Sequence, residues 1–433
     1  MKRIAIVGAG FAGLEAAFGL ERLFRDSAEY EVTLIGEVNY FMFTPLLPQV
    51  ASSYINPRHI VQPVRDVRGR RNFRFLRERV EAVEPDARRL QLAGGNFEYD
   101  YLVLAPGSST NYFGIPGARE NTLDYKTLED GVRLRERILD LCEHADHSAD
   151  AAERARLLTF VVVGGGYTGV ELMAEMRDFY HQYVLRKFRG IRREDVRLVI
   201  LEAAPAILRS VHPSLARHAV ERLAAGGVEI RTGAKVTRCL ADGIEIDGSE
   251  FLPAHTVVWA AGVRAHPLVE ALPGRHDRIG RAVVNEHLQI EGHPEVFVAG
   301  DSAAPGNAPD APQIAPVAIE QGELAARNIR HMERGERLES YRFVNQGSLV
   351  ALGMNYAVVN VFGIRLRGYL AWLIWNAIHL LKLVGFKKQV QVAFDWALAM
   401  VFPRDASSVR RPRECPLCAA RSGVAETART AKA

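Results

Sequence analysis

Three glycines near the N-terminus have the spacing that binds the pyrophosphate of a dinucleotide. Gly8, Gly10 and Gly13 stand between an apolar run and an Ala-rich segment in "RIAIVGAGFAGLEAAFGL". In this pattern the first glycine permits a tight turn, the second lets the backbone approach the phosphates, and the third lets the following helix pack against the strand. The free N–H groups at the start of that helix face the phosphate charge. The order of strand, turn and helix therefore predicts a dinucleotide site.

A second copy of the pattern lies in "LLTFVVVGGGYTGVELMAEM", where Gly164, Gly166 and Gly169 repeat the spacing. The next apolar run, "VRLVILEAAP", ends at Glu202. A carboxylate at this point accepts hydrogen bonds from the ribose hydroxyls of NADH and repels a 2′-phosphate. This site is therefore predicted to prefer NADH to NADPH, although Glu202 also fits a solvated charge at the end of a strand.

Two dinucleotide sites in one chain indicate a fixed flavin and a nicotinamide that exchanges. In the first unit Gly36 stands where an acid is expected, and Glu37 follows it. That unit is completed by "VFVAGDSAA", where Asp301 can bind the ribityl or pyrophosphate-linked groups of FAD. The second unit closes with "TVVWAAG", in which Ala261 and Gly262 leave room for the nicotinamide of NADH. Hydride would pass from NADH to the flavin N5, with the protein supplying position and electrostatics.

The order of these segments predicts an α/β chain with two Rossmann-like dinucleotide-binding domains, arranged as in glutathione reductase, and a C-terminal amphipathic helical membrane-binding region. We expect the FAD-binding domain at residues 1–115 and 265–330, and the NADH-binding domain at residues 116–264. A membrane-anchor or dimerisation region is expected at 331–403, and a disordered tail at 404–433.

Composition excludes several other classes of protein. The 55 basic and 51 acidic residues leave a net charge of +4, so no nucleic-acid partner is predicted. The start "MKRIAIVGAG" lacks the apolar segment of a secretory signal. The four cysteines form no disulfide framework, which favours a reducing compartment. Cys415 and Cys418 make one C-x-x-C, which is half of a metal site, so no metal is predicted; a metal shared across a dimer, a redox disulfide and an inert tail stay open.

The C-terminal region is apolar but interrupted by charges. "YLAWLIWNAIHLL" at 369–381 is followed by "KLVGFKK" and "QVQVAFDWALAMVF". These segments predict two amphipathic helices that lie on a bilayer, with His379 as a packing residue. Aromatic rings suited to the interface, and cations suited to anionic headgroups, are Tyr369, Trp372, Trp375, Trp396, Lys382, Lys387, Lys388 and Arg404. A hairpin that packs against a domain or a second subunit is the alternative, and both functions together are also open.

These features together resemble the type II NADH:quinone oxidoreductases, which are single-chain flavoenzymes of the membrane surface. The resemblance extends to about residue 403. The motifs that carry it are "IVGAGFAGLEAA", "NYFMFTPLLPQVASS", "YLVLAPGSSTNYFGIPG", "KTLEDGVRLRERI", "VVVGGGYTGVELMAE", "TVVWAAGVRAHPL" and "VFVAGDSAA". The glycine patterns alone fit the whole superfamily, whereas "FTPLLPQVA" and the C-terminal region narrow the match. One departure is Pro106, where the family usually has threonine.

The resemblance implies which residues touch the cofactors. Thr44, Pro45 and Leu46 would lie against the isoalloxazine, and Glu171 would reach toward the meeting point of flavin and nicotinamide. Without the resemblance, Glu171 reads as an acid that favours a helix N-terminus. The residues implied for FAD are Gly8, Gly10, Phe11, Ala12, Gly13, Glu37, Thr44, Pro45, Leu46, Val80, Ala105, Gly107, Gly300, Asp301 and Ala318. Those implied for NADH are Gly164, Gly166, Tyr167, Gly169, Glu202, Ala261 and Gly262.

The resemblance also implies the reaction and its setting. Electrons from NADH would pass through FAD to ubiquinone or menaquinone without proton pumping. The protein would be a peripheral homodimer on the cytoplasmic face of the cell membrane.

The stretch "APVAIEQ" at 315–321 departs from the family where the quinone would bind. The family pattern is A-Q-x-A-x-Q, and Pro316 and Glu320 replace its glutamines, while Ala318 and Gln321 keep the surrounding pattern. Pro316 cannot donate to a quinone carbonyl, but a protonated Glu320 can. Pro316, Glu320 and Gln321 join Glu171 as candidate catalytic residues. A reductase with a different acceptor, a flavin- and NADH-binding redox sensor, and a plain surface acid at Glu320 are the alternatives.

Overall fold

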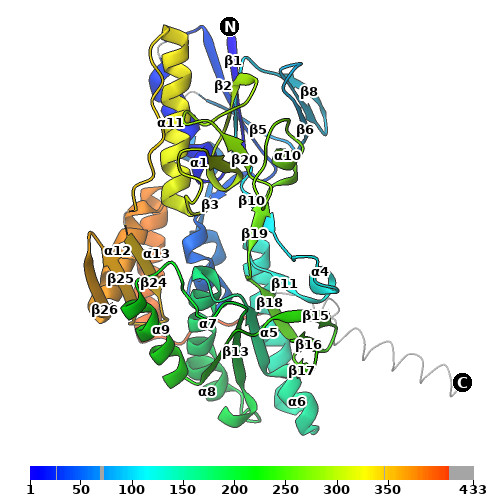
Figure 1. The fold of residues 1–433 in the computed structure, drawn as a ribbon. Coiled ribbons are helices and arrows are strands. Elements are labelled where there is room, and N and C mark those ends of the chain that lie inside the picture. Colours follow the sequence, from blue (N-terminus) through cyan, green and yellow to red (C-terminus); the bar gives the residue numbers. More distant parts are fainter. Residues whose placement is uncertain (26, 69–72, 346, 409–433) are drawn as a thin grey trace, which may run out of the picture. The chain divides into compact units, whose positions relative to one another are not determined.

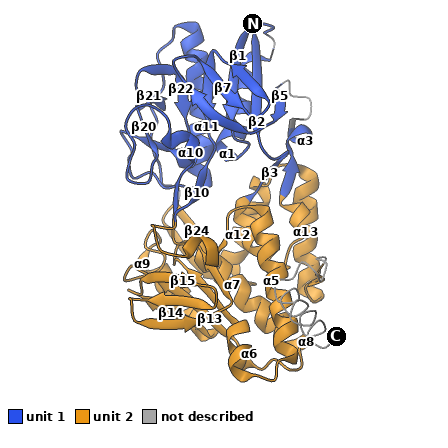
Figure 2. Cartoon of the chain, turned by 90° about the vertical axis from the view of Figure 1, so that its right-hand side faces the viewer, with its two compact units in different colours: residues 1–43, 61–111, 263–345 blue, residues 44–60, 112–262, 346–433 orange. Residues whose placement is uncertain are grey.

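The computed structural model describes residues 1–25, 27–68, 73–345 and 347–408. The chain forms two compact units, coloured separately in Figure 2. Unit 1 comprises Met1–Phe43, Val61–Asn111 and Val263–Asn345. Unit 2 comprises Thr44–Ile60, Tyr112–Gly262 and the chain from residue 346 on. The disordered tail expected beyond residue 408 and the Cys415–Cys418 motif lie outside the described residues.

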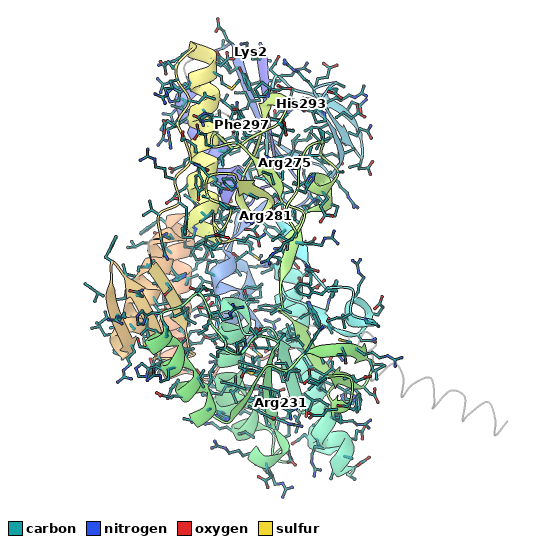
Figure 3. All side chains as sticks on the ribbon, in the orientation of Figure 1. Lys2, Arg231, Arg275, Arg281, His293 and Phe297 are labelled. Carbon is teal, nitrogen blue, oxygen red and sulfur yellow. The ribbon has the colours of Figure 1, made fainter. Side chains whose placement is uncertain are left out.

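Unit 1 is built on a six-stranded sheet in the order β21-β22-β9-β1-β2-β5 (Figure 1). All neighbouring strands are parallel except β21, which is antiparallel to β22. Apolar side chains on both faces make these strands the core, and Ile4 and Phe297 (Figure 3) are fully buried. The strands are β1 (Lys2–Val7), β2 (Tyr30–Gly36), β5 (Arg74–Arg77), β9 (Tyr101–Leu104), β21 (Gln289–Ile290) and β22 (His293–Val298).

Two long helices pack together in unit 1. α1 (Phe11–Phe24) connects β1 to β2, and α11 (Ala315–Arg334) follows the sheet. Gly322 of α11 allows this approach, because a Cβ there would lie 2.2 Å from the carbonyl oxygen of Ala12. The remaining elements of unit 1 are β3 (Tyr40–Met42), β4 (Val61–Pro63), α3 (Val64–Arg68), β6 (Val80–Glu84), β7 (Arg89–Leu92), β8 (Gly95–Glu98), β10 (Ser108–Thr110), β19 (Val263–Ala265), α10 (Pro267–Glu270), β20 (Ala282–Val284), η5 (Gly300–Ser302) and β23 (Ala303–Pro305).

Unit 2 contains a five-stranded parallel sheet in the order β11-β18-β12-β13-β14. α7 (Tyr167–Phe179) connects β12 to β13 and α9 (Pro213–Ala225) connects β13 to β14, so the unit repeats the strand–helix–strand plan of unit 1. The strands of unit 2 before residue 263 are β11 (Leu123–Asp124), β12 (Thr159–Val163), β13 (Arg197–Glu202), β14 (Val228–Thr232), β15 (Val236–Leu240), β16 (Gly243–Ile246), β17 (Glu250–Pro253) and β18 (Thr256–Trp259).

The remaining helices of unit 2 before residue 263 range from three-residue turns to the 20-residue α5. Thr127 and Asp130 form a capping box at the start of α5, and Gly131 brings α5 close to Leu47 of α2. The helices are η1 (Thr44–Leu46), α2 (Leu47–Ala51), η2 (Pro57–His59), α4 (Ala118–Asn121), α5 (Leu128–His147), α6 (Ala151–Leu157), the π-helix η3 (Tyr180–Val184), α8 (Leu185–Lys187) and η4 (Arg193–Asp195).

The C-terminal part of unit 2 is an antiparallel sheet followed by two helices. The strands are β24 (Gly347–Ala351), β25 (Ala357–Val361) and β26 (Ile364–Gly368), and the helices are α12 (Tyr369–Lys382) and α13 (Phe386–Val401). The two expected helices are therefore present. Across the described residues, every helix is too short or too polar to cross a bilayer.

Three tryptophans of these helices were expected at a membrane interface, and this expectation is wrong. Trp372 is 4 %, Trp375 2 % and Trp396 7 % exposed. Their rings fill the interior of unit 2, where the Trp396 indole N–H donates to Oε1 of Gln49 at 2.8 Å. His379 is a packing residue, as expected, because its ring stacks on Trp375 with centroids 3.9 Å apart.

Candidate active site

The first glycine turn lies between β1 and α1 in unit 1. Gly8 has φ +102°, and a Cβ there would lie 2.2 Å from the carbonyl oxygen of Ala105. A Cβ on Gly13 would lie 1.8 Å from the Gly8 oxygen, so both positions require glycine. A Cβ on Gly10 would meet nothing within 4 Å. The turn is therefore closed on the protein side and open at the middle glycine.

The start of α1 offers backbone donors to an anion. Gly10 is its N-cap, none of the described side chains caps it, and its first turn carries no acid. The first N–H groups of a helix have no partner within the helix, so this end suits a phosphate. Phe11 begins the helix and packs edge-on against Phe41, with ring centroids 5.0 Å apart. Four buried alanines pack together beside Phe11, and their small side chains allow close packing of the segments that carry them. They are Ala12, Ala105, Ala299 and Ala318.

Asp301 stands in the turn η5, directly after β22 and Ala299. Its Oδ2 accepts a hydrogen bond from the Ser108 hydroxyl at 2.6 Å. The preceding N–H, that of Gly300, donates to Oε1 of Gln321 at 2.7 Å, and Gln321 is only 1 % exposed. Gln321 thus fixes the turn that carries Asp301. A buried amide in this role is a support for the turn, which spacing alone did not indicate.

The other residues implied for FAD within unit 1 lie in varied surroundings. Glu37 follows β2 and is exposed, and its Oε1 lies 3.8 Å from Nε of Arg79. It stands at the glycine-turn end of the sheet, because the Gly8 N–H bonds the β2 carbonyl of Ile35 at 2.8 Å. Val80 is buried at the start of β6, and Gly107 has φ +80°.

The start of α11 presents two different faces. Pro316 occupies the first turn, which suits a residue without an N–H. Pro316 and Glu320 are half-buried, whereas Ala318 and Gln321 are buried. The helix therefore turns its proline and its acid to one side, and its alanine and glutamine toward the interior of unit 1.

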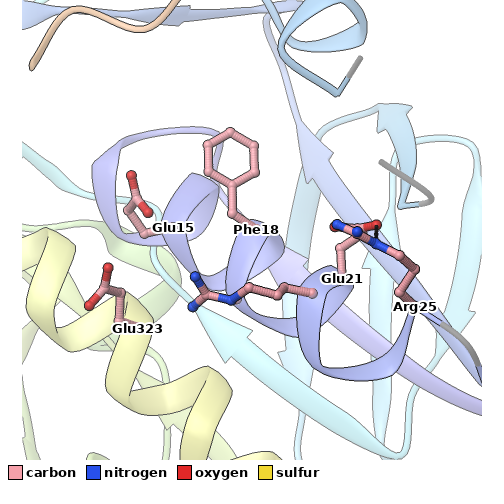
Figure 4. Close-up of a pocket in the computed structure, with 7 residues that line it drawn as sticks. Glu15, Phe18, Glu21, Arg25 and Glu323 are labelled. Carbon is pink, nitrogen blue, oxygen red and sulfur yellow. Dashed lines mark hydrogen bonds and ion pairs between the residues drawn. The ribbon is translucent and has the colours of Figure 1, made fainter. Parts of the chain in front are cut away.

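A pocket elsewhere on α1 and α11 contains none of the residues predicted for a site (Figure 4). It is lined by charged side chains of both signs together with one aromatic ring. The lining residues are Glu15, Phe18, Gly19, Glu21, Arg22, Arg25 and Glu323.

The second glycine turn, in unit 2, reproduces the first. Gly164 has φ +115°, and a Cβ there would lie 2.3 Å from the Ala260 oxygen. A Cβ on Gly169 would lie 2.0 Å from the Gly164 oxygen, while one on Gly166 would meet nothing within 4 Å. α7 then begins at Tyr167 with no acid in its first turn and no cap from a described side chain. The two units therefore carry the same anion-binding geometry.

Glu202 is held beside this second turn. Its Oε2 accepts from the Gly165 N–H and its Oε1 from the Ala204 N–H, each at 2.7 Å. These two bonds fix the carboxylate at the end of β13, so it is more than a solvated charge. Ala261 and Gly262 follow β18, and a Cβ on Gly262 would lie 2.8 Å from the ring of Phe113.

The segment expected against a flavin ring, Thr44–Leu46, forms η1 in unit 2. Thr44 is exposed, Pro45 is half-buried and Leu46 is fully buried. Of these residues, Thr44 and Pro45 present side chains at the surface of the unit, whereas Leu46 packs inside it.

Glu171 is a half-buried residue of α7 in unit 2. Its Oε1 accepts a hydrogen bond from the Ala351 N–H at 2.8 Å. Burial raises the pKa of Glu171 to about 8, and the hydrogen bond from the Ala351 N–H and the nearby Trp375 indole only partly offset this. The charge of Glu175 raises the same pKa further. Glu171 therefore holds its proton at neutral pH.

A buried cluster around Glu175 escaped the sequence analysis. Oε2 of Glu175 accepts from the Ser52 hydroxyl at 2.8 Å and lies 3.5 Å from Nη1 of Arg404. The expectation that Arg404 meets lipid headgroups is wrong, because its side chain is 4 % exposed. The spacing of Glu171 and Glu175, which puts both on one helix face, was an available signal. Nothing in the sequence around Arg404 indicated its partner.

Metal and thiol chemistry receive no support from the described part of the chain. Residues 1–408, as described, contain no group of three or more side chains that could hold a metal ion. Cys142 and Cys239 are free and buried, and burial raises the pKa of Cys239 to about 11. Such thiols are unreactive.

Comparison with known proteins gives a consistent answer. The family described as pyridine nucleotide-disulphide oxidoreductase matches residues 2–322, and the NDH2 C-terminal domain matches residues 345–405. The chain is 36 % identical to the type II NADH:quinone oxidoreductase NdhA of Mycobacterium tuberculosis, over 92 % of this chain and 87 % of that protein. It is 31 % identical to the type II NADH:quinone oxidoreductase of Staphylococcus aureus, over 85 % and 91 %.

Solved structures share the fold. NDH2 of Plasmodium falciparum in complex with NADH superposes with a TM-score of 0.86 at 19 % identity, covering 94 % of this chain and 100 % of that one. The sulfide:quinone oxidoreductase of Aquifex aeolicus superposes with a TM-score of 0.71, also at 19 % identity, covering 93 % and 96 %. At these identities the likeness concerns the fold alone.

Proposed function

The chain belongs to the type II NADH:quinone oxidoreductases, within the pyridine nucleotide-disulphide oxidoreductase family, and we propose how its residues serve that reaction. It is a flavoprotein-family enzyme that transfers electrons from NADH to a quinone. The observation that carries the assignment of cofactors is the pair of glycine turns. In each turn protein atoms crowd the first and last glycines, and the middle glycine is open.

Unit 1 is proposed to hold FAD. The open middle glycine and the uncapped start of α1 fit the pyrophosphate, and the exposed Glu37 fits a ribose. Asp301, held by Ser108 on a turn fixed by Gln321, fits the ribityl side. Bound FAD would take a hydride from NADH and pass its electrons on. The protein residues bind, orient and shield that group.

Unit 2 is proposed to hold NADH. Gly166 gives the phosphates access to the start of α7, and Glu202 points a fixed carboxylate at the position of the ribose. Since that carboxylate repels a 2′-phosphate, NADH is preferred to NADPH. Ala261 and Gly262 leave room for the nicotinamide, and the neighbouring Phe113 side chain, 57 % exposed, shapes that edge of the unit.

Two acids are proposed for the proton chemistry. Net reduction of a quinone by NADH takes up one proton from water, because the hydride brings two electrons and one hydrogen. Glu171 holds a proton on its carboxyl at neutral pH, and Glu320 is the acid beside Pro316 on α11. Gln321 supports the Gly300 turn in this scheme, from a buried position inside unit 1.

Attachment to the membrane is proposed through the outer faces of α12 and α13. Lys382 and Lys387 are exposed there and suit anionic headgroups. Exposed apolar side chains in this number along two neighbouring helices suit an interaction surface. The set comprises Tyr369, Leu370, Leu373, Leu381, Phe386, Val390, Phe394, Leu398, Met400, Val401 and Phe402. These side chains support peripheral attachment to a membrane, for which we propose the cytoplasmic face of the cell membrane, and a homodimer is a second proposed use of the same surface.

Steady-state oxidation of NADH tests the assignment. We expect oxidation that depends on an added short-chain quinone, that is far slower with NADPH, and whose KM for NADH rises in Glu202→Ala. Gly165 and Ala204 would then lose their acceptor, so a thermal melt must show that the variant is folded. Equal rates with NADPH, or a rate that does not respond to quinone, would contradict the proposal.

A further inference from the structure

We propose that Arg404, in the segment after α13, is a positioning residue for the reaction: through the carboxylate of Glu175 it keeps a proton on Glu171. This inference rests on the proposed function, since it concerns the proton that quinone reduction takes up. All three residues belong to unit 2.

The geometry is a buried ion pair closed by a serine. Arg404 Nη1 lies 3.5 Å from Oε2 of Glu175 and donates to the carbonyl oxygen of Ser52 at 3.0 Å. The Ser52 hydroxyl donates to the same Glu175 oxygen at 2.8 Å. Both charged side chains are at most 4 % exposed. The Arg404 charge therefore acts on Glu175 with little screening by water.

The remaining donors of Arg404 point to a role beyond stability. Its guanidinium lies over the ring of Tyr54, 5.0 Å from the centroid. Its Nε and Nη2 have no hydrogen-bond partner among the described residues, and neither has the Tyr54 hydroxyl. Burying unpaired donors on a charged group costs stability, and apolar residues would fill this space at lower cost. We infer that the function of Arg404 at this position is to supply its positive charge.

That charge reaches Glu171 in two steps. Burial raises the pKa of Glu175 and Asp178 adds to that rise, whereas Arg404, Ser52 and Arg177 oppose it. Arg404 makes the largest of the opposing contributions, so its charge favours the ionised form of Glu175. Glu175 follows Glu171 by four residues on α7, so the two carboxyls share a helix face. Ionised Glu175 raises the pKa of Glu171 and so favours the protonated acid. Without Arg404, Glu175 takes up a proton and Glu171 releases its own more readily.

Other charged and titratable groups face the pair from the neighbouring elements. Arg177 and Asp178 on α7 pair with each other at 2.6 Å. Tyr54 and Tyr125 face the acids, and burial raises the pKa of each. On α12, the Trp375 indole faces Glu171, and burial lowers the pKa of His379 to about 4, which leaves it neutral. Glu175 is thus the neighbour through which Arg404 can act.

The test compares Arg404→Met, Arg404→Lys and Glu175→Gln in the full-length holoenzyme. Quinone reduction at saturating NADH is measured against pH, and the protonated Glu171 carboxyl is titrated by its infrared C=O band, assigned with Glu171→Gln. We expect R404M and E175Q to move the alkaline limb and the band to lower pH by about one unit. R404K, which keeps the positive charge, should leave the limb and the band close to their wild-type pH. R404M introduced into the E175Q protein should cause no further shift. Arg89→Met, which breaks the ion pair with Glu84 in unit 1, serves as the control and should leave the alkaline limb and the infrared band unchanged.

An unshifted limb and band in R404M and E175Q proteins that retain flavin would overturn the inference. So would a fall in kcat of the same factor at every pH, since a merely structural role predicts it. Failure of the proposed function is distinguishable: the wild type would then show no quinone-dependent oxidation of NADH, while the infrared titration would still report whether Arg404 and Glu175 control the proton on Glu171.

Discussion

The middle glycine of each turn separates cofactor binding from folding. Gly10 has φ −82° and ψ −166°, and Gly166 has φ −75° and ψ −174°, which are conformations that alanine adopts readily. Neither position has a protein atom within 4 Å of an added Cβ. Gly10→Ala and Gly166→Ala should therefore leave the cofactor-free fold intact, and restriction of the unfolded chain should stabilise it by about 0.4–1 kcal/mol.

The same methyl groups stand where the pyrophosphate must approach the backbone. Loss of one backbone hydrogen bond to a charged phosphate costs about 1.5–3 kcal/mol, which is roughly a ten- to hundredfold weaker Kd. G10A should lose FAD on desalting, and its Kd should rise when the cofactor-free protein is titrated with FAD by fluorescence. G166A should keep its flavin and show a raised KM for NADH. Each variant is the matched control for the other.

The result that would refute this reasoning is normal affinity for FAD in G10A and an unchanged KM for NADH in G166A, with both proteins folded. The glycine turns would then not be the phosphate sites. A fall in the melting temperature of the cofactor-free G10A protein would show that the methyl group meets protein, contrary to the open space at Gly10.

Three further outcomes are expected. Gln321→Ala leaves the buried Gly300 N–H without its acceptor, so chemical denaturation of the cofactor-free protein should show a loss of about 1–3 kcal/mol; an unchanged midpoint would contradict the supporting role. Glu171 has its pKa raised from 4.5 to about 8, so the folded state holds a proton across that window which the unfolded chain releases. Stability should fall as pH rises from about 4.5 to 8, and Glu171→Gln should flatten that fall; equal slopes in denaturation series would refute the burial argument. Leu381→Asp with Phe386→Asp, both at exposed positions, should abolish flotation with anionic liposomes while the melting temperature stays unchanged, and full flotation would exclude this surface.

The repeated strand–turn–helix units were predictable because their glycines obey strict local geometry. Glycine is required at Gly8 and Gly13 because of what a Cβ would strike there, and the structure shows those contacts directly, while the space at Gly10 is open. The two C-terminal helices were also predictable from their apolar segments. Such signals lie within about twenty residues of one another, where sequence reasoning is strongest.

Which face of an amphipathic helix is covered depends on partners that are distant in the sequence. Trp396 looks like an interfacial residue until Gln49, far away in the chain, accepts its indole N–H. Arg404 looks like a headgroup ligand until the fold brings it to Glu175 and Ser52. Both errors have one cause, because an aromatic or cationic side chain on or just after an apolar helix suits a lipid surface and a buried polar partner equally well.

The division of the chain into domains shows the same dependence. The expected FAD-binding domain comprises residues 1–115 and 265–330, yet the segment 44–60 belongs by its contacts to unit 2. α2 packs there against α5, which begins about eighty residues later. The expected boundaries of the cofactor domains stay a prediction, to be settled by where each cofactor binds.

The central claim, transfer of electrons from NADH through a bound flavin to a quinone, is tested most directly by an anaerobic visible spectrum of the purified protein. The account predicts a flavin spectrum that bleaches when NADH is added and returns promptly when a water-soluble quinone follows. A protein without a flavin spectrum would contradict the assignment of FAD to unit 1. A flavin that bleaches with NADH but stays reduced in the presence of quinone would show that Pro316 and Glu320 accompany a different electron acceptor.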